Sequence, residues 1–357
     1  MALLKSAEKF GKKALTFIFK IFVKQEKISF NKIDISKIDK VLIIRQDRRI
    51  GNLILTTPLI QKTKTVFPNA DIDILIAKSN LILCEDNPHL NRIYPFDHTG
   101  FIYNPFRFLK LISTLRKNKY SVLIESSKPS SVSFLNGYLA YLTKSPIRIG
   151  FENGSGSIFT NFHVKPDLTR HYSEIQQDLV NFLSTEESYL QPHIFPNEIE
   201  AKKMRTLLNE KFNITEHGRI IGIWIGARGK KKWNIENFIK LFNRIKSETE
   251  YFPILVFGIE EGEDFAGINK EKYSAFRIID LKNLKSFILS SDVFICGDTG
   301  PLHFSYALGT PTIGIFLEDS YERYGYTDGE KNLIVKPSNP ETMIDEIIKS
   351  INKILTK

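Results

Sequence analysis

The segment Asp298-Thr299-Gly300-Pro301-Leu302-His303 holds the residues best suited to binding an anion. It follows an apolar run at 293–296 and precedes another at 304–308, which predicts a buried strand, a turn and a helix. The first N–H groups of a helix lack partners within it and lie at its positive end, so this turn can bind a pyrophosphate. The alternative is an ordinary turn in which Asp298 or Thr299 caps the helix.

A basic loop about 70 residues earlier has a similar setting. The sequence Gly226-Ala227-Arg228-Gly229-Lys230-Lys231-Lys232-Trp233 follows an apolar run at 220–225. Its small residues let the backbone approach a ligand closely, and its crowded cations repel one another unless an anion lies among them. A solvated basic loop is the alternative. A diphosphate bound by this loop and by the Asp298 turn would explain both elements.

Two further segments follow predicted strands. Residues 44–58 contain Asp47, Gly51 and Asn52, and Asn52 is a good N-cap residue for the helix that we expect directly after it. Asp47 could pair with a neighbouring arginine. The sequence lacks G-x-G-x-x-G here, which argues against a nicotinamide dehydrogenase. Residues 258–263 are rich in acid, and Glu261 could accept hydrogen bonds from ribose hydroxyls or be only solvated.

Short β-rich runs alternate with helical segments from residue 39 onward, which predicts parallel sheets covered on both faces. The predicted strands are residues 40–44, 72–76, 92–94, 121–124, 220–225, 254–257, 276–279, 293–296 and 312–316. The predicted helices are residues 53–67, 106–116, 131–142, 171–183, 235–246, 284–289, 302–308 and 340–355. A proline-containing linker at 186–197 separates the two series. We therefore expect a basic segment at 1–38 and two doubly wound domains, 39–190 and 191–357, with a ligand cleft at their strand ends.

The composition is that of a globular protein, with 42% hydrophobic and 25% charged residues. Cys84 and Cys296 lie in apolar runs and predict buried thiols in a reducing compartment. The Cys and His spacings predict no metal site. The net charge of +10 favours anionic partners, but no nucleic-acid motif is present.

Residues 2–25 carry lysines among apolar residues at roughly helical spacing. The lysines interrupt the apolar residues too often for a spanning helix, and no cleavage site follows as in a signal peptide. The pattern predicts an amphipathic helix on an anionic membrane surface. An arm packed on the protein body or on a second copy is the alternative.

These motifs together resemble the bacterial heptosyltransferases of glycosyltransferase family 9, over roughly residues 39–350. That family has an Arg-x-Asp-Arg-Ile-Gly-Asp-like turn and a Leu-x-Thr-x-Pro helix, which resemble residues 45–58 here. It also has Asp-Thr-Gly-x-x-His and Gly-x-Pro, which match Asp298 to His303 and Gly309 to Pro311. The family's Lys-x-Trp element resembles Lys231-Lys232-Trp233, with Lys231 as the donor-binding lysine.

The resemblance implies an α/β GT-B fold of two Rossmann-like domains facing across a cleft, with the acceptor on the first and the nucleotide sugar on the second. It implies inverting transfer from ADP-heptose to a lipopolysaccharide-type glycolipid at the cytoplasmic face of the inner membrane, without a metal or other cofactor. The expected donor-binding residues are Gly226, Arg228, Lys231, Glu261, Asp298, Thr299, Gly300 and His303. The expected acceptor-binding residues are Gly51, Lys128 and Arg148, the last two placed at strand ends.

The sequence departs from the family at its catalytic base. Asn52 stands where the family has aspartate, and Arg49 is an apparent insertion just before it. An amide cannot take a proton from a hydroxyl at neutral pH. Three alternatives follow: Asp47 is the base, Asn52 positions an acceptor that reacts through a more dissociative transition state, or the chain is a catalytically degenerate nucleotide- and glycan-binding scaffold.

Overall fold

The computed structural model describes residue 23, residues 28–29, and residues 34–129, 133–152, 156–184, 188–259 and 272–356. The chain divides into two compact units. The N-terminal unit consists of Met1–Arg48 and Thr56–Leu190, and the C-terminal unit consists of Arg49–Leu55 and Gln191–Lys357. A short segment from the first part of the sequence therefore belongs to the C-terminal unit.

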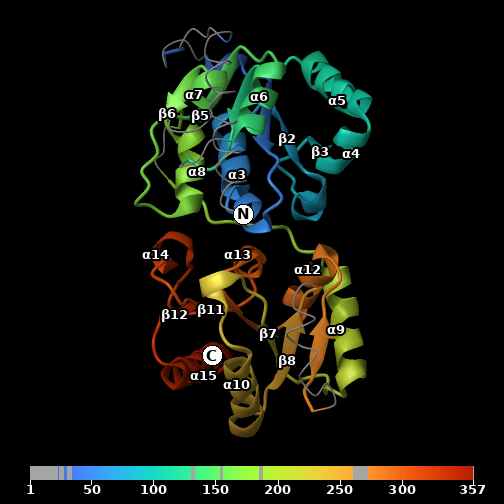
Figure 1. The fold of residues 1–357 in the computed structure, drawn as a ribbon, viewed down its shortest axis with the longest axis vertical. Coiled ribbons are helices and arrows are strands. Elements are labelled where there is room, and N and C mark those ends of the chain that lie inside the picture. The colour runs from blue at the N-terminus through green and yellow to red at the C-terminus, as the bar shows by residue number, and fades with distance from the viewer. Residues whose placement is uncertain are drawn as a thin grey trace, which may run out of the picture. The chain divides into compact units, whose positions relative to one another are not determined.

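The N-terminal unit is a six-stranded parallel sheet with helices on both faces (Figure 1). Its strand order is β3-β2-β1-β4-β5-β6. Its elements are η2 (Ile35–Lys37), β1 (Lys40–Arg45), α3 (Thr57–Val66), β2 (Asp71–Ala77), η3 (Lys78–Leu83), β3 (Arg92–Phe96), α4 (His98–Tyr103), α5 (Pro105–Lys117), β4 (Val122–Glu125), α6 (Phe134–Leu142), β5 (Ile147–Phe151), α7 (Gly156–Phe159), β6 (Phe162–Val164) and α8 (Tyr172–Asn181).

The C-terminal unit repeats this architecture with the order β12-β11-β10-β7-β8-β9. Its elements are α2 (Ile50–Ile54), α9 (Glu198–Phe212), β7 (Ile220–Trp224), η4 (Gly229–Lys231), α10 (Ile235–Glu248), β8 (Phe252–Phe257), β9 (Ala275–Arg277), α12 (Leu281–Ser290), β10 (Val293–Gly297), α13 (Gly300–Ala307), β11 (Thr312–Ile315), α14 (Tyr321–Tyr324), β12 (Asn332–Val335) and α15 (Pro340–Leu355).

Each sheet has one topological switch point, where the strand order reverses. It lies between β1 and β4 in the first sheet and between β7 and β10 in the second. Ligands of doubly wound sheets bind outside the carboxyl ends of the strands at such points. The fold therefore directs attention to the loops after these four strands.

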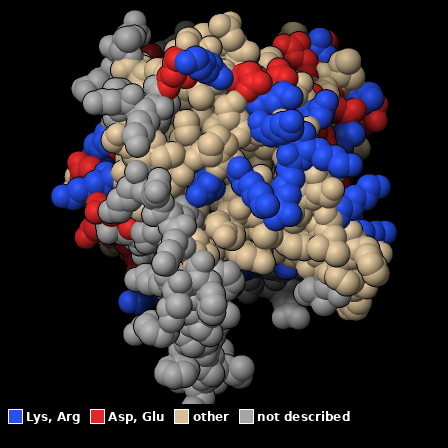
Figure 2. Space-filling model, turned by 90° about the horizontal axis from the view of Figure 1, so that it is seen from above, with Lys and Arg blue, Asp and Glu red and all other residues tan. Residues whose placement is uncertain are grey.

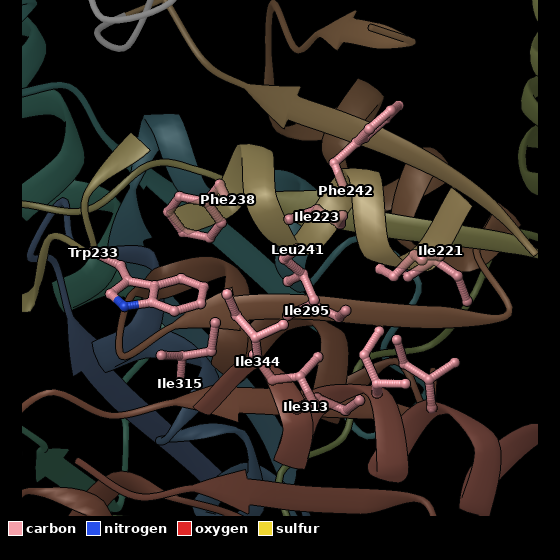
Figure 3. Close-up of a cluster of buried hydrophobic side chains, with 14 of the residues drawn as sticks. Ile221, Ile223, Trp233, Phe238, Leu241, Phe242, Ile295, Ile313, Ile315 and Ile344 are labelled. Atoms are coloured by element: carbon pink, nitrogen blue, oxygen red, sulfur yellow. The ribbon is translucent and has the colours of Figure 1, made fainter. Parts of the chain in front are cut away.

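An apolar core fixes the β7 and β10 ends of the C-terminal sheet (Figure 3). The buried isoleucines of β7, β10 and β11 pack against side chains of α10 and α15, including Phe238, Leu241 and Ile344. Trp233 lies in the same cluster, 5% exposed, with its ring edge-to-face on Phe238 at 5.0 Å. The residue that ends the basic loop is thus anchored in the core.

The structure confirms the predicted α/β alternation, and it corrects several boundaries. The helix expected at 53–67 is two helices, α2 and α3, with Leu55 and Thr56 between them. The strands β5, β6 and β12, which have at most five residues each, were not predicted, and neither were the helices α4, α7, α9 and α14. The strands and the short helices carry too few periods of a hydrophobic pattern to stand out. The helix α9 has 15 residues, but it buries only Met204 and Leu208, so its apolar stripe is weak.

Candidate functional site

The loop after β7 brings a lysine to the switch point. Gly229 has φ +60°, a left-handed conformation that favours glycine, and it opens the single turn η4. The indole N–H of Trp224 donates to the Gly226 carbonyl at 2.8 Å, which fixes the beginning of the loop. Since Trp233 fixes its end, Lys231 is held between two anchored points.

Lys231 forms an ion pair with Asp298, the residue that follows β10. Asp298 is buried, at 6% exposed, whereas the Lys231 side chain is 37% exposed. Ser320 donates a second hydrogen bond to the same Asp298 oxygen at 2.8 Å, and the Lys231 ammonium lies 5.7 Å from the centre of the Tyr324 ring. The structure thus brings together two sequence-predicted residues 67 positions apart.

The start of α13 lies directly after Asp298. The helix begins at Gly300, two residues earlier than predicted, and its N-cap is Thr299. Thr299 is thus the N-cap by position, as the alternative predicted, but its side chain makes no capping bond. Pro301 has no N–H, and the Leu302 N–H donates to the Thr299 carbonyl at 3.1 Å. The Gly300 N–H is therefore the donor of this turn that the helix itself does not use. A cation, a buried carboxylate and a helix N-terminus therefore meet at one strand end, a combination that suits a diphosphate.

The short helix α2 packs on α13 through two glycines. A Cβ atom on Gly51 would lie 2.7 Å from Cδ2 of His303, and one on Gly300 would lie 2.7 Å from Cδ1 of Ile50. Both distances are below any ordinary contact, so each glycine accommodates a side chain of the other helix. The close approach of α2 to α13 depends on the absence of these two side chains.

Asn52 lies within α2, one residue after Gly51. The helix begins at Ile50 and its N-cap is Arg49, so the prediction that Asn52 caps a helix beginning after it is wrong. The structure places this residue in the C-terminal unit with the donor-binding candidates. Sequence reasoning could not assign α2 to that unit, because α2 follows β1 so closely along the chain.

His303 is buried among tyrosines on α13. It is 6% exposed, its Nδ1 lies 3.0 Å from the Tyr326 hydroxyl, and the Tyr326 ring stacks on Tyr306 at 3.7 Å. Burial raises the pKa of Tyr326 well above its usual value, so this hydroxyl stays neutral. These contacts fix the imidazole ring. Tyr326 and Ser320 belong to no motif, and the aromatic-rich run at 321–326 is the feature of the sequence that marks their neighbourhood.

The N-terminal unit places Asp47 at the end of β1 beside a buried arginine. The Arg45 Nε atom lies 2.9 Å from the Asp47 carboxylate. The Arg45 guanidinium is fully buried, donates to the Ser126 carbonyl, and lies 3.3 Å from the Tyr172 hydroxyl. Asp47 therefore pairs with Arg45, and its carboxylate remains 35% exposed.

Glu125 ends β4, opposite Ile44 of β1, at the switch point of the first sheet. Burial raises the pKa of its carboxyl group to about 7, although hydrogen bonding to Ser127 and the charge of Arg45 act in the opposite direction. Glu125 could not be recognised from the sequence, because a single acidic residue at a strand end forms no motif.

The other residues predicted to bind the donor or the acceptor lie in different settings in the structure. Lys128 is exposed and follows β4, at the carboxyl edge as expected. Arg148 lies near the amino end of β5, and its guanidinium donates to the carbonyls of Phe159, at 2.9 Å, and Ser145. The expectation that it lies at a ligand-binding strand end is therefore wrong. Arg228 is exposed on the basic loop, while Glu261 and nearly all of the amphipathic segment at 2–25 lie outside the described residues.

Within the described ranges, no three His, Cys, Asp or Glu side chains gather in an arrangement that could hold a metal ion. Both cysteines are buried and free. In the same ranges, each helix is too short or too polar to cross a bilayer.

Comparison with known proteins gives a consistent result. The family model for glycosyltransferase family 9 (heptosyltransferase) matches residues 108–348. Lipopolysaccharide heptosyltransferase 3 of Escherichia coli strain K12 is 24% identical over 276 residues, covering 74% of this chain and 79% of that protein. Lipopolysaccharide heptosyltransferase 1 of Campylobacter coli is 24% identical over 302 residues, covering 78% and 83%. These matches favour an enzyme over a degenerate scaffold.

Solved structures confirm the GT-B fold. The crystal structure of a glycosyltransferase family 9 protein from Veillonella parvula superposes with a TM-score of 0.72 at 19% identity, covering 89% of this chain and 90% of that one. An ADP-heptose lipopolysaccharide heptosyltransferase II of E. coli superposes with a TM-score of 0.66 at 17% identity, covering 87% and 98%. At sequence identities this low, the structural similarity establishes the fold alone.

Proposed function

Since this chain belongs to glycosyltransferase family 9, the heptosyltransferase family, and is a glycosyltransferase, we propose that it transfers a heptose or related sugar from an ADP-sugar. The acceptor is a lipopolysaccharide core or a related surface glycan. The observation that carries the proposal is the Lys231–Asp298 pair beside the N-terminus of α13, at the switch point of the C-terminal sheet. The ADP-heptose named for the E. coli structural relative supports the choice of nucleotide.

The donor site stabilises the charge that develops on the leaving group. An acceptor hydroxyl attacks the anomeric carbon, the bond from that carbon to the diphosphate oxygen breaks, and the configuration inverts. The departing diphosphate gains negative charge, which Lys231 and the Gly300 N–H are placed to stabilise. Because Asp298 and Ser320 orient the lysine before the reaction, a fixed cation of the protein performs the task that a metal performs elsewhere. The remaining donor-side candidates, including Arg228 and Glu261, complete this pocket in the proposal.

The proton of the acceptor hydroxyl needs a base. Asp47 is the carboxylate on the loop where the family has its base, and Arg45 holds it at 2.9 Å. Asn52 then positions the acceptor instead of deprotonating it, with Gly51 and Lys128 as further acceptor contacts. The transfer takes place at the inner face of the inner membrane, where residues 2–25 bind anionic lipid.

A transfer assay with ADP-heptose and a lipopolysaccharide core acceptor tests this assignment. We expect Asp47→Asn to lower kcat by about 100-fold or more, because general base catalysis is worth that much, while ADP binding stays unchanged. Asn52→Asp is the matched variant at the family's usual position. Full activity of Asp47→Asn would contradict the assignment of the base. Activity only after Asn52→Asp would mean that the natural chain is not catalytic with this donor.

A further inference from the structure

One stretch of the N-terminal unit carries most of the excess positive charge. Residues 98–151 contain eight lysines and arginines and a single acidic residue, Glu125. Glu125 is 1% exposed, so it offers no compensating charge at the surface. On the face seen in Figure 2, Lys and Arg side chains gather in one region of the molecule. Apart from Lys128, the transfer reaction proposed above uses none of the cations of residues 98–151.

Two lysines of this stretch occupy equivalent positions on neighbouring loops. Lys119 follows the C-cap of α5 and Lys144 follows the C-cap of α6, with φ angles of 52° and 60°. Since β4 and β5 pair with Val122 opposite Ile147, each lysine lies three residues before the same register position. Glycine or asparagine is usual in this left-handed conformation, so the chain places two cations side by side at a small conformational cost.

A cavity of about 460 Å³ lies between these loops. Arg116, Lys119 and Lys144 bring three cations to it, together with Tyr120, Ser121, Thr143 and Pro146. Among the residues that the structure describes, none of the three cations forms an ion pair with a carboxylate, although Arg116 donates to the Leu142 carbonyl at 2.6 Å.

Two carboxylates accept hydrogen bonds from side chains that line the cavity. Ser121 donates to Asp39, and Tyr120 donates to Asp73 at 2.6 Å. These hydroxyl groups leave Asp39 and Asp73 charged, but three cations line the cavity and neither carboxylate is ion-paired with them. The cavity is therefore net positive and has polar walls, which suit a phosphate group.

Exposed apolar side chains continue this surface along α5. Tyr103 is 84% exposed, Phe106 77% and Leu109 59%. Positions 106, 109, 110, 113 and 117 share one face of α5, so its outer stripe changes from apolar at the N-terminal end to basic at Lys117. An amphipathic surface of this kind fits the boundary between lipid headgroups and acyl chains.

We propose that α4, α5 and the loops at Lys119 and Lys144 form a docking surface for an anionic lipid bilayer. Tyr103, Phe106 and Leu109 insert into the interface, and the cavity binds a lipid phosphate through Arg116, Lys119 and Lys144. Because α4 follows the carboxyl end of β3, the inserted end lies at the sheet edge that carries the proposed acceptor contacts. This surface is separate from residues 2–25 and does not depend on which sugar is transferred.

Vesicle co-sedimentation of the full chain tests the proposal. The vesicles are phosphatidylcholine alone, or phosphatidylcholine mixed with phosphatidylglycerol. We expect Lys119→Asn/Lys144→Asn to weaken partitioning to the anionic vesicles about tenfold or more, because each lysine near an anionic lipid surface contributes to the free energy of binding. Asparagine tolerates the left-handed conformation, so this variant should remain folded. The triple variant Tyr103→Ser/Phe106→Ser/Leu109→Ser should also lose binding.

Matched controls separate docking from general charge and hydrophobicity. Lys349→Gln/Lys353→Gln removes two exposed lysines of α15, and Ile199→Ser/Leu207→Ser removes two exposed apolar residues of α9. Both controls should bind vesicles as the natural chain does, and every variant should bind ADP normally. Unchanged vesicle binding of both docking variants would overturn the proposal. If Lys119→Asn/Lys144→Asn lost calorimetric binding to inorganic phosphate but still bound anionic vesicles, the cavity would be a site for free phosphate. That result would also contradict its role in binding lipid.

Discussion

Replacing Gly51 with alanine tests how α2 joins the donor site. The new Cβ would lie 2.7 Å from Cδ2 and 3.5 Å from Nε2 of His303. Carbon atoms pack at about 3.5–4.0 Å, so the ring or the helix must move by roughly 0.8 Å or more. The ring cannot move without disturbing its contacts with Tyr326 and Tyr324. Overpacking of this kind costs about 1–3 kcal/mol.

Whether Gly51→Ala lowers or raises the free energy of unfolding is informative, because the higher helix propensity of alanine opposes the destabilisation by overpacking. Alanine in a helix is favoured over glycine by roughly 0.5–1 kcal/mol. We therefore expect Gly51→Ala to destabilise the C-terminal unit by about 1–2 kcal/mol net of that gain. Without the contact to His303, the same substitution would stabilise it.

Urea denaturation followed by tryptophan fluorescence measures this change. The protein has 2 tryptophans, Trp224 and Trp233, and both lie in the C-terminal unit, so the signal reports on that unit. In a His303→Ala background the clash is absent, and Gly51→Ala should become neutral or stabilising. Stabilisation by Gly51→Ala in the natural background would refute the packing of α2 on α13.

Three further predictions concern single residues. Lys231→Met should weaken ADP binding by roughly 10- to 100-fold in calorimetry, because the diphosphate loses a charged hydrogen-bond partner. The control Lys230→Met, on the same loop, should change ADP binding little. Equal effects of the two substitutions would mean that the loop binds through its overall charge and not through Lys231. Tyr326→Phe should destabilise the C-terminal unit by about 1 kcal/mol in the fluorescence assay, since buried Nδ1 of His303 loses its partner; an unchanged urea midpoint would count against that hydrogen bond. The pKa of Glu125 is raised to about 7, above that of an unfolded glutamate, so its contribution to stability is fully present below about pH 4 and is lost as the pH rises through 7. Thermal unfolding of Glu125→Gln should therefore show a smaller loss of stability as the pH rises through 7. An equal loss in the variant would mean that another group causes it.

The sequence was sufficient to predict the sheets and both donor loops. Strands such as β7 and β10 are continuous buried apolar runs, and the loops after them carry glycines and charges that mark strand ends. The sequence also predicted that the two loops serve one site, because the carboxyl ends of neighbouring parallel strands share one edge of the sheet. The ion pair between Lys231 and Asp298 was not predicted.

Other features depend on three-dimensional packing that no local pattern encodes. The helix α2 belongs to the C-terminal unit because Gly51 and Gly300 allow close contact, although it follows β1 directly in sequence. Arg148 looked like a ligand contact, but its guanidinium is occupied by backbone carbonyls at the opposite end of the strand. Tyr326 contacts His303 from the segment between α14 and β12, and its residue type gave no indication of this contact.

The identity of the nucleotide tests the central claim most directly. Calorimetric titration of the purified full chain with ADP, UDP, GDP and CDP, with a chelator present, compares the bases under identical conditions. The account predicts that ADP binds most tightly and that the chelator does not weaken it, since Lys231 and the start of α13 supply the charge for the diphosphate. Preference for another nucleotide, or binding of none of the four, would contradict an ADP-sugar transferase.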